Sequence, residues 1–230
     1  MKKLASLLTC ICLILSTTAC SQSKNYSSGN WGSKKVIASN KYVTKDIKVD
    51  NFKKISVAGS PDVTFTQKSG RPKVKDNTLY IGFKKDVNVS YKKLEVRVSA
   101  ETLNGISVAG SGDVFLKNGL QTNDNLSINV AGSGDIKGSG IKCNDMKVSV
   151  AGSGDINADN ITCNNLKVSV AGSGDMVLRN VTATGTEASV AGSGSATITG
   201  TTQTATYSVA GSGDRRLRGS TRYRQCSRLG

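Results

Sequence analysis

The chain alternates apolar and polar residues along short segments, and this alternation returns about every 20 residues. In one segment the apolar residues are Met146, Val148 and Val150, with Lys147 and Ser149 between them. A period of two sends neighbouring side chains to opposite faces of a strand, so each segment predicts a half-buried β-strand. Equivalent positions in neighbouring repeats form apolar columns, which are Leu126/Met146/Leu166, Ile128/Val148/Val168 and Val130/Val150/Val170. No helical period competes, so the pattern predicts an all-β domain.

A Val-Ala-Gly-Ser-Gly-Asp motif follows each of these segments. Its first glycine recurs at spacings of 22, 20, 20, 20 and 19 residues, as Gly110, Gly132, Gly152, Gly172, Gly192 and Gly211. Two more apolar columns come after the motif, Ile136/Ile156/Met176 and Ile141/Ile161/Val181. A fixed period near 20 residues is typical of a solenoid, in which neighbouring repeats complete each other's core. The strand–turn–strand order predicts a parallel β-helix with rungs of about 20 residues, whose corner glycines supply positive φ.

Residues 42–104 lack the regular motif but keep short alternating segments, such as 43–49, 63–66, 78–81 and 94–98. This stretch predicts an irregular, β-rich N-terminal cap on the solenoid. Four of its aromatic residues are expected to cover the open end of the core, namely Phe52, Phe65, Tyr80 and Phe83.

The first 19 residues are predicted to be a lipoprotein signal peptide. Lys2 and Lys3 precede an apolar run of about twelve residues, which is too short to span a membrane, and small residues lead to Cys20. This ending resembles the lipobox of bacterial lipoproteins, which implies cleavage before Cys20 and lipid on its sulfur and amine. Ordinary secretion with a nearby cysteine is the alternative. Residues 20–41 are rich in Ser, Asn, Gly and Lys and are predicted to form a flexible tether.

Several segments together resemble a known family. They read FKKISVAG at 52–59, DVTFTQ at 62–67, LEVRVSA at 94–100 and ISVAGSGD at 106–113. They are similar to the GIN domain, the "putative autotransporter adhesin" head domain of Bacteroidetes lipoproteins. The resemblance covers about residues 42–214 and implies a right-handed parallel β-helix. It implies no catalytic residue.

Residues 215–230 form an anomalous tail. It holds six of the nine arginines and no acidic residue, and the rung pattern is expected to stop at Asp214. Two interpretations stay open: a basic tail for an anionic partner, and a frame-shifted or truncated gene end. Without Lys2, Lys3 and these six arginines, 23 basic residues remain against 16 acidic residues. The formal charge then falls from +15 to +7. This moderate excess favours weak attraction to anionic sugars or lipid headgroups, and a nucleic-acid partner is not expected.

Two sets of residues are candidates for chemistry. Cys143 and Cys163 share one column of adjacent rungs, about 4.8 Å apart at their Cα atoms, which fits two packed thiols or a disulfide between rungs. A metal site on two sulfurs without histidine is disfavoured. Carboxylates also stack at one corner, at Asp113, Asp135, Asp155 and Asp175, with Asp214 as a further candidate. They are weak Ca²⁺ candidates, since backbone donors and solvent can also compensate their repulsion.

No enzyme activity and no cofactor are predicted, because the chain has no histidine and no long loops that could wall a catalytic cleft. The prediction is a binding or adhesion module held to the membrane by a lipid anchor. Its exposed columns, such as Lys147/Lys167 and Asn144/Asn164, are expected to contact a glycan or an envelope protein. A self-associating scaffold and, less favoured, a polysaccharide-active β-helix enzyme are the alternatives. The expected location is the outer membrane, facing the periplasm, with the cell surface as the alternative.

Overall fold

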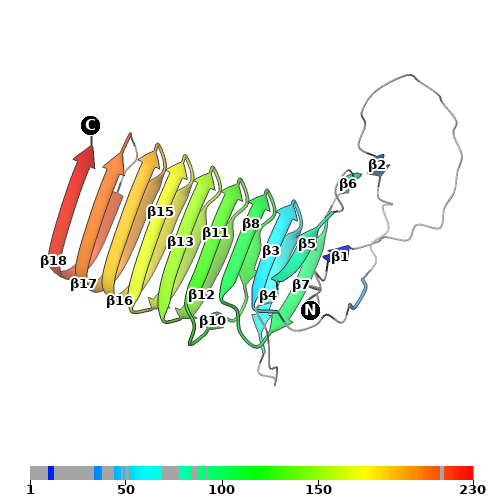
Figure 1. The fold of residues 1–230 in the computed structure, drawn as a ribbon, viewed down its shortest axis with the longest axis horizontal. Coiled ribbons are helices and arrows are strands. Elements are labelled where there is room, and N and C mark those ends of the chain that lie inside the picture. Colours follow the sequence, from blue (N-terminus) through cyan, green and yellow to red (C-terminus); the bar gives the residue numbers. More distant parts are fainter. Residues whose placement is uncertain are drawn as a thin grey trace, which may run out of the picture.

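The chain folds into a right-handed parallel β-helix of about seven turns (Figure 1), which confirms the predicted fold. The computed structural model describes residues 10–12, 34–37, 44–47, 49, 52–68, 78–83, 87–91, 93–212 and 215–229. Every regular element in these ranges is a β-strand. A helix able to cross a membrane is therefore missing from the described ranges.

Each turn of the solenoid contributes to two walls. The first wall contains β3 (Lys54–Gly59), β8 (Gly105–Gly110), β11 (Leu126–Gly132), β13 (Asp145–Gly152) and β15 (Asn165–Gly172). The second wall contains β4 (Asp62–Gln67), β9 (Val114–Leu116), β12 (Ile136–Lys142) and β14 (Ile156–Thr162), and β10 (Leu120–Gln121) pairs with β12. The last turns are continuous strands that contribute to both walls, namely β16 (Asp175–Gly192), β17 (Ser195–Ala210) and β18 (Arg215–Leu229).

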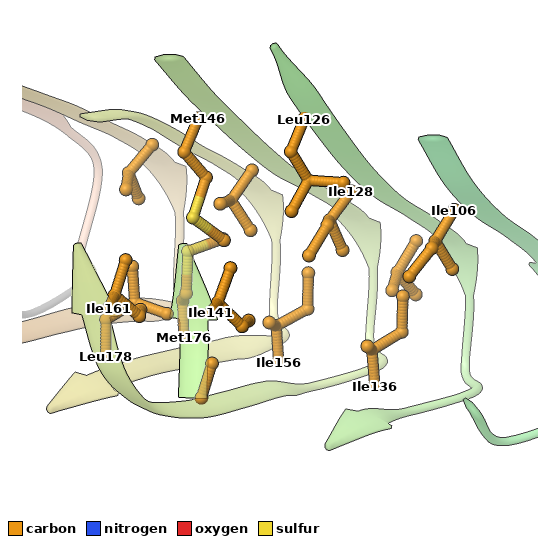
Figure 2. Close-up of a cluster of buried hydrophobic side chains, with 14 of the residues drawn as sticks. Ile106, Leu126, Ile128, Ile136, Ile141, Met146, Ile156, Ile161, Met176 and Leu178 are labelled. Carbon is orange, nitrogen blue, oxygen red and sulfur yellow. The ribbon is translucent and has the colours of Figure 1, made fainter. Parts of the chain in front are cut away.

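The rungs stack in the register that the apolar columns predict. Met146 pairs with Leu126 on one side and with Leu166 on the other, and the two neighbouring columns follow the same register. The second wall also has the predicted register, since Ile156 pairs with Ile136 on one side and with Met176 on the other. Figure 2 shows the side chains of both walls pointing into the interior, among them Leu126, Met146, Ile136, Ile156 and Met176. Val148 and Ile156 are 0% exposed, so this interior is a continuous apolar core.

The N-terminal end departs from the simple order of the repeats. After β3 and β4, the chain places β5 (Thr78–Gly82) beside β3 and β7 (Glu95–Ala100) beside β4, and then returns to pair β8 with β3. Phe52 and Phe65 are buried, whereas Tyr80 is 41% exposed. The expectation that Tyr80 covers the core is therefore wrong. It pairs with Ser56, at an outward position of the strand.

Two short strand pairs occur in the described parts of the remaining N-terminal sequence. β1 (Cys10–Cys12) lies within the predicted signal peptide and its backbone pairs with β5. β2 (Lys34–Ile37) lies within the predicted tether and pairs with β6 (Val87–Ser90). Cys20 lies outside the described residues, so signal peptide, lipidation and tether stay predictions.

The arginine-rich tail adds one more rung to the backbone. β18 pairs in parallel with β17, and Gly219 stands opposite Gly200, each with a φ near +140°. The expectation that the rung pattern stops at Asp214 is thus wrong for the backbone, because Gly219 supplies the same corner as Gly200. The register places Arg215, Arg224 and Arg228 opposite Ala196, Ala205 and Val209, three buried positions. The frame-shift hypothesis stays untested.

Candidate functional site

The aspartate candidates form a continuous hydrogen-bonded ladder at one corner of the solenoid. Oδ1 of each aspartate accepts a hydrogen bond from the backbone N–H of the next one along the axis. The N···O distances are 2.9 Å for Asp135 to Asp113, 3.0 Å for Asp155 to Asp135 and 2.8 Å for Asp175 to Asp155. Ser195 ends the described ladder and donates both its N–H and its hydroxyl to Asp175. The structure thus brings all four predicted residues together, and Asp214 lies outside the described residues.

This ladder explains how the stacked carboxylates are tolerated. Each one faces an amide dipole of the neighbouring rung, and a charge-assisted hydrogen bond offsets the repulsion between carboxylates. Lys137 adds an ion pair of 3.0 Å to Asp135, and this hydrogen bond raises the pKa of the lysine. In the part of the chain that the structure describes, no three His, Cys, Asp or Glu side chains gather as a metal site. The ladder's geometry therefore supports a structural role between rungs.

The ladder gives a stability prediction at Asp155. Asp155→Ala removes the acceptor for the Asp175 N–H, and we expect the free energy of unfolding to fall by about 1–2 kcal/mol. Asp155→Asn keeps an acceptor oxygen and should lose less than half of that. Urea unfolding followed by circular dichroism measures both. An alanine variant as stable as the parent would show that the ladder contributes nothing.

Cys143 and Cys163 stand at equivalent places of adjacent rungs, as predicted, and both are buried with free thiols. Each cysteine directly follows a strand, and its backbone N–H donates to a carbonyl oxygen of the next rung. The acceptor is Thr162 for Cys143 and Thr182 for Cys163. Burial raises the pKa of Cys143 to about 11 and that of Cys163 to about 12. A thiol with so high a pKa is a poor nucleophile at neutral pH, which argues against a reactive site here.

The two thiols predict a pH dependence of stability. Their pKa values are higher in the fold than in the unfolded chain, so their contribution is complete below pH 9. Between pH 9 and 12 the unfolded thiols ionise first, and the free energy of unfolding falls by up to about 1.4 kcal/mol per pH unit for each. The double variant Cys143→Ala/Cys163→Ala should show a shallower fall, because it has no thiol at these positions to ionise. It should still fold, because Ala183 already fills this column in the next rung. Urea unfolding at several pH values under reducing conditions measures the difference, and identical slopes would contradict it.

The outer face of the first wall presents three regular columns of side chains. One column is mostly serine: Ser56, Ser107, Asn129, Ser149, Ser169, Ser189 and Ser208. The next consists of exposed alanines: Ala58, Ala109, Ala131, Ala151, Ala171, Ala191 and Ala210. The third contains the predicted Lys147 and Lys167. Two of the three columns of this face therefore carry mostly small side chains in these rungs. Serine hydroxyl groups repeat along the solenoid axis at the rung spacing of about 4.8 Å.

The predicted contact columns are partly engaged within the protein. Lys167 forms an ion pair of 3.0 Å with Glu187 in the next rung. Asn164 donates to the side chain of Asn144, and Asn144 donates to that of Asn125, at 2.6 and 2.9 Å. These amides connect successive rungs, so part of their hydrogen-bonding capacity serves the fold.

A hollow of about 320 Å³ opens at the N-terminal end of the same face. Its lining includes Lys54, Ser56, Tyr80, Asn104, Gly105 and Ser107. Gly105 occupies the third column between Lys54 and Ser127, so a side chain is missing there. This site was not predicted from the sequence. A signal was present, because Gly105 replaces the larger residue that other rungs carry at this column.

Comparison with known proteins places these features in context. A family model described as "Putative auto-transporter adhesin, head GIN domain" matches residues 51–221. A crystal structure of a "putative adhesin" from Bacteroides fragilis is 27% identical, with a TM-score of 0.66 over 84% of this chain and 100% of that one. Comparison with curated proteins gives no match.

Two further solved structures share the fold at lower identity. A "putative adhesin" from Parabacteroides distasonis has a TM-score of 0.70 at 19% identity, covering 86% of this chain and 98% of that one. A "putative lipid binding protein" from the same species has a TM-score of 0.64 at 19% identity, covering 86% and 100%.

Proposed function

The chain belongs to the family described as "Putative auto-transporter adhesin, head GIN domain", and on that premise we propose that it is a non-enzymatic envelope lipoprotein whose β-solenoid binds glycans. The family supports an adhesion-like role in the cell envelope or at its surface. The glycan ligand, the lipid anchor on Cys20 and the outer-membrane location are parts of the proposal.

The outer face of the first wall is the observation that carries the glycan proposal. Its serine column repeats hydroxyl groups along the solenoid axis, and a polymer with repeating hydroxyl groups can bind such a surface at several rungs at once. The hollow at one end adds an exposed aromatic ring, Tyr80, beside polar side chains. Sugar rings combine apolar C–H groups with hydroxyls, and both find a counterpart here.

A glycan array tests this proposal. The purified full chain, detected with an antibody against it, is applied with and without Ca²⁺. Saturable binding to one class of glycan is expected, and it should not depend on Ca²⁺ if the aspartate ladder is structural. A blank array in both conditions would contradict the proposal, and loss of binding on Ca²⁺ removal would instead make the ladder a metal site.

The lipid anchor has a separate test. Cys20→Ser removes the sulfur that lipidation requires, so the protein should move from the membrane fraction to the soluble fraction of the expressing cells. An unchanged membrane fraction would contradict lipidation at Cys20.

A further inference from the structure

The hollow exists because two features of the sequence coincide at one place on the first wall. One outward column runs through Thr78, Lys54, Gly105 and Ser127, and it lacks a side chain at Gly105, where the stem of Lys54 lies over the backbone. The neighbouring column consists of Tyr80, Ser56, Ser107 and Asn129. Among these four residues, Tyr80 has the one large side chain. The hollow is therefore lined by the side-chain-free position of Gly105 on β8 and by the exposed ring of Tyr80 on β5, with β3 between these two strands.

The polar groups around the hollow have a definite character. Ser56, Ser107 and Ser127 offer hydroxyls, and Lys54 offers an ammonium group. Asn129 offers its amide oxygen, because its Nδ2 already donates to the hydroxyl of Ser127 at 3.0 Å. Among the residues that the structure describes, the lining includes no carboxylate. The side-chain oxygen of Asn104 is buried at the edge of the hollow and has no hydrogen-bond partner among the described residues. An unsatisfied buried acceptor is costly, and a ligand hydroxyl could satisfy it after a small rotation of the amide.

These groups define the ligand class. A volume of about 320 Å³ is at the low end for small-molecule sites, which fits one sugar residue better than a long segment. The face of Tyr80 favours C–H groups of a pyranose ring, because the negative face of an aromatic ring attracts their partial positive charge. Lys54 meets no carboxylate among the described lining residues, and its ammonium group favours an acidic ligand.

We propose that this hollow binds one uronic-acid residue of a glycan, with the pyranose ring against Tyr80 and the carboxylate at Lys54. The proposal rests on the proposed glycan-binding function and gives it a site and a substrate class. The serine column leads away from the hollow along the solenoid, so the rest of the glycan can continue over the following rungs.

Saturation-transfer NMR on the full chain tests the site with two probes, methyl β-D-glucuronide and the neutral methyl β-D-glucoside. The wild type should bind the glucuronide in the millimolar range and several-fold more tightly than the glucoside, about what one charged contact contributes. Tyr80→Ala should weaken both probes by about tenfold, and Tyr80→Phe should keep most of the affinity. Lys54→Gln should weaken only the glucuronide.

Matched controls separate loss of binding from loss of fold. Tyr80 is partly exposed, so Tyr80→Ala should keep the unfolding midpoint of the parent. Phe115→Ala removes a similarly exposed ring from β9 of the second wall, away from the hollow, and should leave binding unchanged. Gly105→Leu fills the hollow; its Cβ would meet the Cγ of Lys54 at 3.0 Å, and that flexible side chain can move. This variant should fold and lose binding.

Three results would overturn the site: no saturable binding of the glucuronide at about 10 mM, equal binding of the two probes, or full affinity in Tyr80→Ala. Each leaves the proposed function standing if the glycan array shows binding. A blank array contradicts the proposed function itself, so the two failures are distinguishable.

Discussion

Gly154→Ala is expected to lower the free energy of unfolding by about 3 kcal/mol or more, at the upper end of what overpacking costs. Gly154 is the second glycine of its motif. A Cβ there would lie 2.2 Å from the carbonyl oxygen of Gly134 and 2.8 Å from Cγ1 of Val130. The contact is with the backbone of the preceding rung, so it cannot be relieved by moving one side chain. The rungs would have to separate at this corner.

The corner that the substitution would disturb is also held by hydrogen bonds. The N–H groups of Ser153 and Gly154 both donate to the carbonyl oxygen of Gly132, at 2.9 and 3.0 Å. Separating the rungs would lengthen both bonds. Urea unfolding monitored by circular dichroism measures the loss. The matched control is Ser153→Ala at the exposed neighbouring position, which should stay within about 0.5 kcal/mol of the parent. If both variants unfold at the parent's urea concentration, the close stacking of this corner is wrong.

Ile156→Ala is expected to cost about 2–5 kcal/mol, the range for removing a large aliphatic side chain from a packed core. Ile156 is 0% exposed and lies between Ile136 and Met176 in the column (Figure 2). Rungs above and below fix the backbone, so the cavity cannot collapse easily. Ile156→Val removes one methylene and should cost about 0.5–1.5 kcal/mol. The same urea titration tests both, and a loss below about 1 kcal/mol for the alanine variant would contradict a rigidly stacked core.

The regular part of the fold could be predicted from the sequence because its repeats constrain each other. A one-residue slip would turn Met146, Val148 and Val150 outward, so the columns determine the register. The first glycine of the motif was also predictable, and Gly152 has a φ of +128°. The second glycine serves a different need, because it avoids a collision with the preceding rung. That distinction depends on distances between rungs, which the sequence does not contain.

Other features depend on contacts between distant residues. The pairing of β3 with β8 joins Lys54 to Gly105 across an insertion that carries no repeat. Asn160 and Asn180 adopt positive φ, at 55° and 52°. In these two rungs an asparagine stands at the corner where the preceding rung has Gly140. Asparagine tolerates this conformation, but it also occurs in many other settings, so the pattern alone is ambiguous.

The candidate sites were predicted unevenly for similar reasons. The aspartate column was visible because its residues share a motif position. The partner of each carboxylate was not, because the N–H donor belongs to the next rung rather than to the same turn. Tyr80 was expected in the core, since aromatic residues near a solenoid end commonly cover it. Its outward position follows from the pairing with Ser56, which appears only once β5 is placed beside β3.

The most direct test of glycan binding through the first wall is a glycan array probed with the wild type and Tyr80→Ala side by side. We expect the wild type to bind glycans containing uronic acids and the variant to lose most of this binding while keeping its fold. A wild-type protein that binds none of the glycans would contradict the account.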